Sequence, residues 1–322
     1  METKNSSQIW VDKYRPKTFD EILGQDYFVS RIKAFLESKN LPHLLFAGVP
    51  GTGKTTTALV IAQELYTKDA LCGNFLELNA SDDRGIDVIR NQIKEFAKLK
   101  SLTNIPYKIV CLDEADSLTK EAQQALRRTM EKYSASCRFI LACNEISKLI
   151  DPIQSRCVIF KFKPLSDTAL LTLLEKVADN EKLSIDKETK KFIVKISNGD
   201  TRRLLNTLQA CASIQKNITE ELINEILDYV NPKEIEEMIN NALNGNFNKA
   251  KDLMIKLKNF RGLSGLEILK EMYKQVLEID IDDKSKIKII ERIATVEFRI
   301  VEGSDEELQL QALLAMIALG KN

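Results

Sequence analysis

Long apolar runs are absent from this chain of 322 residues. No stretch reaches the roughly 18 apolar residues that a transmembrane helix needs, so we expect no contact with a membrane. The N-terminal segment METKNSSQIWVDKYRP also lacks the apolar core of a signal peptide. We therefore expect the protein to stay inside the cell.

Metal-binding patterns are equally scarce. The chain has a single histidine, His43, and its six cysteines form no CxxC pair. This excludes a zinc site built on the usual ligand spacing. Cys111, Cys143 and Cys157 stand in apolar runs, where a thiol is expected to pack as a small buried side chain.

An excess of charge of one sign is absent too. The 47 basic residues balance the 47 acidic residues, which excludes a surface that is basic all over. A basic track confined to one face is compatible with this balance.

Five short apolar runs organise the first half of the chain. Each is rich in β-branched or aromatic residues, is bounded by polar or turn residues, and predicts a strand. Amphipathic segments such as 54–66 and 86–99 separate most of the runs and predict helices. This alternation predicts a parallel sheet with helices on both faces. The runs are HLLFAG (43–48), FLELNA (75–80), KIVCLD (108–113), RFILAC (138–143) and CVIFKF (157–162).

The pattern of strands stops after Pro164. Three segments within 166–213 have the spacing of amphipathic helices. Pro232 follows an asparagine and marks another boundary, beyond which the chain is again helical in pattern. We predict an α/β domain, a small helical domain and an all-α domain, with the boundaries 1–163, 164–230 and 231–322.

A phosphate-binding pattern follows the first apolar run. GVPGTGKT (48–55) fits GxxxxGK[ST], the P-loop, between a predicted strand and a predicted helix. Its glycines let backbone N–H groups surround phosphate oxygens, and the helix N-terminus adds positive dipole. Lys54 is expected to reach the β- and γ-phosphates and Thr55 to bind Mg²⁺; a glycine turn that arose by chance is the weak alternative. The expected nucleotide contacts are Gly48, Val49, Pro50, Gly51, Thr52, Gly53, Lys54, Thr55 and Thr56.

Carboxylates stand at the end of the third apolar run, in LDEAD (112–116), and two of them carry a chemical signal. Asp113 is placed at the C-terminal end of a strand, where it can hold Mg²⁺ directly or through water. Glu114 is the natural general base for the attacking water. The alternative is a surface loop with solvated carboxylates, which the neighbouring P-loop makes less attractive.

Three further polar positions carry weaker signals. Asn144 ends another predicted strand, where an amide can orient water, although asparagine there is usually turn chemistry. Arg156 precedes the last strand, and from the residues alone an exposed charge is the better interpretation. Arg202 and Arg203 open a helix, where the dipole disfavours basic residues, so a bound anion would explain them.

Several longer segments together carry a resemblance to one family. They are WVDKYRP (10–16), ILGQ (22–25), GVPGTGKT (48–55), ELNASDDRGIDVIR (77–90), LDEADSLT (112–119), AQQALRRTMEKYS (122–134), SRC (155–157), GDTRRLLNTLQ (199–209), EFR (297–299) and QLQALLA (309–315). In these segments the chain resembles the small subunits of replication factor C, the sliding-clamp loader within the AAA+ ATPases, and most of all the archaeal ones. The resemblance covers essentially the whole chain and implies a P-loop AAA+ domain with a five-stranded parallel sheet, a helical lid and a helical collar.

The resemblance also implies roles for matching positions. An adenine pocket would be lined by Val11, Tyr14, Arg15 and Pro16. Asn144 would be sensor 1, Arg202 would be sensor 2, and Arg156 would be an arginine finger acting on ATP held by a neighbouring subunit. This role reverses the interpretation of Arg156 as an idle charge. The residues that would follow DNA phosphates are Arg84, Arg90 and Lys148.

The function implied by the resemblance is ATP-dependent loading of a sliding clamp onto primed DNA, with ATP and Mg²⁺ as cofactors. The implied partners are other small subunits, a large clamp-loader subunit, a clamp of the PCNA type and primer–template DNA. The protein would be cytoplasmic in an archaeal cell, or nuclear if its source is eukaryotic. Val49 departs from the proline usual in the family, but this position of the pattern is permissive. Two alternatives remain: a nucleotide-binding scaffold subunit without turnover, and another AAA+ DNA motor, for which a C-terminal winged helix would be expected.

Overall fold

The computed structural model describes residues 9–38, 40–81, 89–99, 107–226, 232–261 and 263–320. The chain divides into two compact units, residues 1–218 and 219–322. This division places residues 164–218 of the predicted lid with the predicted nucleotide domain, and residues 219–230 with the predicted all-α domain. The finer three-domain division stays a prediction. No helix in the described part of the chain is long and apolar enough to cross a membrane.

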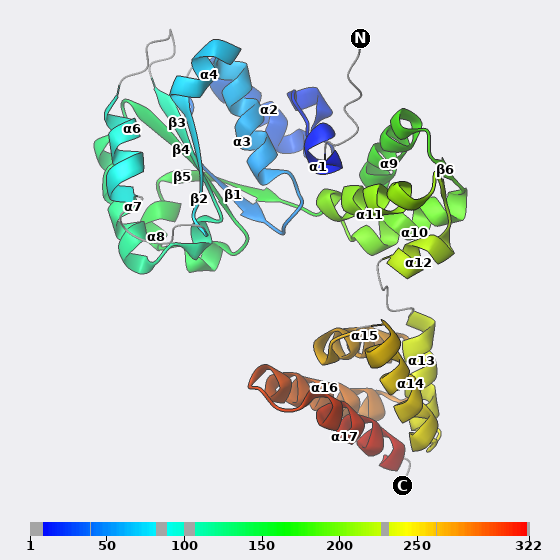
Figure 1. The fold of residues 1–322 in the computed structure, drawn as a ribbon. Helices are drawn as coiled ribbons and strands as arrows, with labels where there is room; N and C mark the ends of the chain where they lie inside the picture. Colours follow the sequence, from blue (N-terminus) through cyan, green and yellow to red (C-terminus); the bar gives the residue numbers. More distant parts are fainter. Residues whose placement is uncertain are drawn as a thin grey trace. The chain divides into compact units, whose positions relative to one another are not determined.

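A five-stranded parallel sheet forms the centre of the first unit (Figure 1), as the apolar runs predicted. The strand order is β2-β3-β4-β1-β5, so β1, which leads into the P-loop, lies between β4 and β5. The predicted bounds hold to within one residue: the second strand ends one residue earlier and the fourth begins one residue earlier than expected. The strands are β1 (His43–Gly48), β2 (Phe75–Asn79), β3 (Lys108–Asp113), β4 (Cys137–Cys143) and β5 (Cys157–Phe162).

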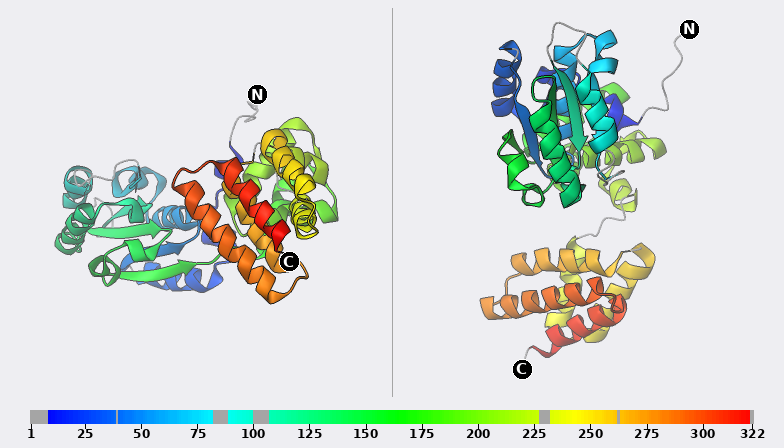
Figure 2. Two further views of the ribbon diagram at one scale, coloured as in Figure 1. Left: turned by 90° about the horizontal axis from the view of Figure 1, so that it is seen from below. Right: turned by 90° about the vertical axis from the view of Figure 1, so that its left-hand side faces the viewer.

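Helices cover both faces of this sheet (Figure 1 and Figure 2). Successive strand residues point to opposite faces, so Leu44 and Phe46 pack in one core and Leu45 in the other. The first core is closed by α2 (Asp26–Glu37) and α3 (Lys54–Leu65), and the second by α6 (Lys94–Lys98) and α7 (Lys120–Lys132). The remaining elements of this part are α1 (Trp10–Lys13), η1 (Phe19–Glu21), α4 (Lys68–Asn74), η2 (Ile89–Ile93), η3 (Ala115–Ser117), η4 (Ile146–Lys148) and α8 (Asp151–Gln154).

Three helices follow the sheet within the first unit. All three begin at side-chain caps: Ser166 accepts a hydrogen bond from Ala169 N, Asp186 accepts from the N–H groups of residues 188 and 189, and Asp200 accepts from those of residues 202 and 203. The helices are α9 (Asp167–Glu181), α10 (Lys187–Ser197) and α11 (Thr201–Ile214).

The expectation that no strand follows Pro164 was wrong in one detail. Two short strands, β6 (Ser184–Ile185) and β7 (Asn217–Ile218), pair in parallel. Each has two residues, which is too short to leave an alternating pattern in the sequence.

The second unit is helical throughout its described residues, as predicted. Its apolar core takes side chains from five helices, among them Met238, Met254, Met272, Val296 and Leu313. A capping box between Ser264 and Glu267 begins the third of these five. The unit contains α12 (Glu220–Ile226), α13 (Pro232–Leu243), α14 (Phe247–Arg261), α15 (Gly265–Glu278), α16 (Asp283–Val301) and α17 (Glu306–Leu319).

Candidate nucleotide-binding site

The P-loop connects the end of β1 to the start of α3. Gly51 and Gly53 have φ angles of 71° and 92°, in the left-handed region where a side chain would be strained. A Cβ on Gly51 would also lie 1.7 Å from Asp200 Oδ1. The loop therefore needs glycine at both positions, and the second one caps the helix whose N-terminus faces the cavity described below.

Lys54 is held at the centre of this loop. Its Nζ donates hydrogen bonds to Gly48 O at 2.7 Å, Val49 O at 2.9 Å and Asn144 Oδ1 at 3.1 Å. Burial lowers the pKa of Lys54, and the nearby Asp113 carboxylate opposes this shift. The fold thus brings Asn144, at the end of β4, to the predicted phosphate-binding lysine.

Oxygen ligands suited to a hard cation meet beside Lys54. Thr55 Oγ1 donates to Asp113 Oδ2 at 2.5 Å, and Asp113 Oδ1 accepts from Glu114 N at 2.9 Å. One hydroxyl and one carboxylate are a donor set that fits Mg²⁺, which keeps several waters and binds few protein oxygens. The residues present therefore fit the metal role that the sequence predicted for Thr55 and Asp113.

Glu114 follows β3 in a strained backbone conformation. Its φ and ψ angles are 49° and 40°, which a glutamate rarely adopts. Such strain concentrates at functional positions, where it fixes the direction of a side chain. Here Glu114 lines the same cavity as Lys54 and Thr55.

A cavity of about 410 Å³ joins these groups. Predicted site residues form much of its wall, whereas Gly48 and Val49 lie off the wall and contribute carbonyls to Lys54 instead. The sequence did not single out Glu77, whose pKa is raised by burial, or the apolar Leu173 and Leu205. The predicted residues on the wall are Val11, Tyr14, Arg15, Pro16, Pro50, Gly51, Thr52, Gly53, Lys54, Thr55, Thr56, Asp113, Glu114, Asn144 and Arg202.

The segment predicted to contact adenine is attached to the helices that follow the sheet. Glu181 Oε1, at the end of α9, accepts from Tyr14 Oη at 2.7 Å and from Lys13 Nζ at 2.5 Å. Trp10 N donates to Gln209 Oε1 of α11 at 2.8 Å. Burial, helped by the bond to Glu181, raises the pKa of Tyr14. Side chains about 170 or more positions away in sequence thus hold this wall of the cavity.

The same helices also bond directly to the P-loop. Gly51 O accepts from Thr201 N at 3.1 Å and from Thr201 Oγ1 at 2.8 Å. Asp200 supplies a carboxylate to the start of α11, where Arg202 reaches the cavity wall. That carboxylate is an anionic group of the chain itself at the start of α11. The sequence pattern had predicted a bound anion at this position.

Asp116 fixes the loop that carries Asn144. Its Oδ2 accepts from Asn144 N at 3.2 Å and from Glu145 N at 3.0 Å. The last residue of the DEAD segment therefore sets the backbone from which the Asn144 amide reaches Lys54. The sequence alone gives no signal for this role of Asp116.

Replacing Asp116 with alanine should lower ATP turnover about 10- to 100-fold, because a displacement of about 1 Å at a positioning group has effects of that size. Nucleotide affinity should change less than about twofold, since the P-loop contacts are intact. Steady-state ATPase kinetics and a nucleotide-binding titration measure the two effects. Glu145→Ala, in the same loop, is the matched control; a loss of affinity without loss of turnover would contradict a positioning role.

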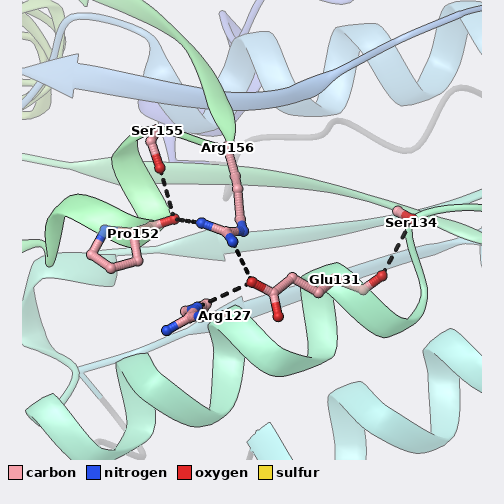
Figure 3. Close-up of polar contacts among 6 residues, drawn as sticks. All are labelled: Arg127, Glu131, Ser134, Pro152, Ser155 and Arg156. Atoms are coloured by element: carbon pink, nitrogen blue, oxygen red, sulfur yellow. Dashed lines mark hydrogen bonds and ion pairs between the residues drawn. The ribbon is translucent and has the colours of Figure 1, made fainter.

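The remaining predicted residues lie away from the cavity or outside the described residues. Arg156, just before β5, pairs with Glu131 of α7 (Figure 3) and does not line the cavity. Lys148 is exposed and bonds to Glu145 Oε1 at 2.8 Å, which raises the pKa of Lys148. Arg84 lies outside the described residues, as does the side chain of Arg90.

Known proteins match this chain along nearly its whole length. The family model for the AAA ATPases associated with various cellular activities matches residues 44–165, and the replication factor C C-terminal domain model matches 230–316. A replication factor C small subunit of Saccharolobus solfataricus is 48% identical to this chain. The aligned region covers 100% of this chain and 98% of that relative. One from Archaeoglobus fulgidus is 45% identical and covers 97% of each chain. The chain belongs to the replication factor C small subunit family.

Solved structures give an independent likeness in fold. The Holliday junction branch migration motor RuvB of Thermotoga maritima superposes with a TM-score of 0.56, covering 82% of this chain and 91% of its own. At 21% identity the likeness concerns the fold alone. Membership of the replication factor C small subunits, with an AAA match that spans the P-loop, Asp113, Glu114 and Asn144, makes this chain a nucleotide-binding ATPase.

Proposed function

We propose that this chain is a clamp-loader small subunit that uses ATP to load a DNA polymerase sliding clamp onto primed DNA. The observation that carries the proposal is the division of the predicted catalytic residues. Lys54, Glu114, Asn144 and Arg202 meet in one cavity, whereas Arg156 lies outside it. An arginine finger that lies outside the nucleotide site of its own chain is suited to act on the nucleotide of a neighbouring subunit.

Within the cavity each residue has a distinct task. Lys54 binds the β- and γ-phosphate oxygens, and Glu114 accepts the proton of the attacking water. Asn144 orients that water, and Arg202 reaches the γ-phosphate from α11. Thr55 and Asp113 would hold Mg²⁺, which would supply positive charge to the phosphate oxygens. Arg156 stabilises transition-state charge on the nucleotide of the adjacent subunit.

Membership of the replication factor C small subunits supports the partners that we propose. They are other small subunits, a large clamp-loader subunit, a sliding clamp of the PCNA type and primer–template DNA. ATP binding assembles the subunits into a spiral around DNA, and hydrolysis releases the loaded clamp. ATPase activity of the purified chain, with and without primed DNA, a clamp and a candidate large subunit, tests this proposal. Native mass shows in the same preparation whether the chain assembles alone.

The alternatives make different predictions for the same assay. A scaffold subunit would bind ATP in the complete assembly without hydrolysing it at its own site. Adding clamp and DNA would not change the ATPase activity of that site. Another AAA+ DNA motor would hydrolyse ATP on DNA without any effect of the clamp. The described part of residues 232–322 contains only helices, which does not suit the winged helix expected of a Holliday-junction motor.

Charge reversal of the proposed DNA contacts is the second test. Changing Arg84, Arg90 and Lys148 together to glutamate should reduce DNA-stimulated ATPase while basal ATPase stays within about twofold. Phosphate contacts carry no sequence code, so DNA affinity should fall on every sequence, and the slope of log K against log salt should flatten by about one unit per lost contact. DNA titrations at several salt concentrations measure this. An equal loss of basal and stimulated activity would indicate misfolding, and an unchanged salt slope would remove these residues as DNA contacts.

A further inference from the structure

The guanidinium of Arg156 is held at two points (Figure 3). Its Nη1 donates to Pro152 O, in the short helix that precedes it, at 2.7 Å. Its Nη2 pairs with Glu131 Oε1 near the end of α7. Ser155 Oγ donates to the same Pro152 carbonyl at 3.3 Å, which ties the segment before Arg156 together. The side chain is thus directed across α7 by contacts from two separate elements.

Glu131 serves a second arginine at the same time. Its Oε1 also accepts from Arg127 Nε at 3.1 Å, one helical turn earlier on α7. The bond to Arg127, and then the charge of both arginines, lowers the pKa of Glu131. The carboxylate therefore stays ionised near neutral pH, and the three side chains carry a net charge of +1. An exposed cluster with residual positive charge is suited to face an anionic ligand.

The pair with Glu131 leaves most of the Arg156 donors available. A guanidinium carries five N–H donors, and the two contacts above use two of them. Three remain to reach an oxyanion while both contacts persist. The side chains of Arg156 and Glu131 are 33% and 38% exposed. An ion pair this exposed shifts the equilibrium between its formed and broken states by about fivefold at most. That is too little to prevent Arg156 from binding a triphosphate.

We propose that Glu131 is a positioning residue for Arg156, which fixes the direction of the guanidinium before a neighbouring subunit docks. A long arginine side chain otherwise samples many rotamers, and it loses this conformational entropy when it binds a phosphate. Glu131 and Pro152 O remove part of this freedom in advance, as preorganisation requires. This inference rests on the proposed function of Arg156 in the adjacent site.

Glu131→Ala in the assembled complex tests the inference. We expect turnover at saturating ATP, with DNA and clamp present, to fall about three- to fivefold, the most that so exposed an ion pair can contribute, while KM and the nucleotide affinity of the separate subunit stay unchanged. Glu131→Gln keeps an acceptor oxygen without the charge and should retain an intermediate activity. Glu121→Ala, an exposed glutamate in the first turn of the same helix, is the matched control for loss of a surface carboxylate.

A double-mutant cycle with Arg156→Ala separates the possible outcomes. If Glu131 acts through Arg156, Glu131→Ala should have less than about a twofold effect when Arg156 is already alanine. The same loss in both backgrounds would indicate a structural role and overturn the inference. Increased turnover in Glu131→Ala would overturn it too, because it would mean that Glu131 restrains the arginine.

The cycle also distinguishes this inference from the proposed function. If Arg156→Ala lowers turnover and Glu131→Ala does not, only the role of Glu131 is wrong. If Arg156→Ala itself leaves turnover intact, the assignment of Arg156 fails and the role of Glu131 fails with it.

Discussion

Glu114→Gln should retain ATP binding and lose turnover by about 10²- to 10⁴-fold, the usual contribution of a positioned general base. Glutamine keeps the size of the side chain and cannot accept the proton of the attacking water. ATP affinity should stay unchanged, since Lys54 and the P-loop backbone are untouched. Phosphate release under steady-state conditions and a titration with labelled nucleotide measure the two quantities.

Glu77 provides a matched control for this result. It is another carboxylate on the cavity wall, on β2, where burial raises its pKa and the charge of Arg15 partly opposes this shift. Glu77→Gln should leave most of the turnover. If Glu114→Gln turns over ATP at a near-normal rate, Glu114 is not the base; if Glu77→Gln abolishes turnover instead, that role belongs to Glu77.

Arg156→Ala should lower turnover in the assembled complex by about 10³- to 10⁵-fold, the range found for arginines supplied in trans to GTPases. In the isolated subunit the same change should leave nucleotide affinity unaltered, because Arg156 does not line the cavity of its own chain. Turnover of the assembly with DNA and clamp, and nucleotide titration of the subunit alone, give the comparison.

Removing an exposed cation elsewhere controls for a general effect of charge. Lys191→Ala deletes a lysine that pairs with Glu188 on α10, and it should alter neither quantity. Weaker nucleotide binding by the isolated Arg156→Ala subunit would place Arg156 in its own site and contradict action on a neighbour.

The sheet and the P-loop could be predicted because their signals are local. Residues 43–48 and 108–113 are compact apolar runs, and the observed strands have those same bounds. The P-loop spacing fixes the order of its residues along the chain, and the left-handed Gly51 and Gly53 match its glycine positions. A cap such as Ser166 is also a local signal, because a cap and its helix are adjacent in sequence.

Contacts between distant residues left no such signal. The bond of Glu181 to Tyr14 joins residues 167 positions apart, and that of Thr201 to Gly51 joins residues 150 positions apart. A single sequence shows each of these residues only as an ordinary polar position. The pairing of Glu131 with Arg156 was hidden for the same reason, since 25 residues separate them. The approach of Asp200 to Gly51 of the P-loop was hidden in the same way.

The attachment of two cavity walls to the same helices has a thermodynamic consequence. Glu181 of α9 holds Tyr14 on one wall, and Thr201 of α11 holds the Gly51 carbonyl on another. A nucleotide that occupies the cavity between them is therefore linked to the folding of residues 167–214. ATP binding stabilises these helices. By reciprocity, a substitution that loosens their apolar core, far from the phosphates, weakens ATP binding. The melting temperature of these helices and the dissociation constant of ATP are two measurements of one coupling.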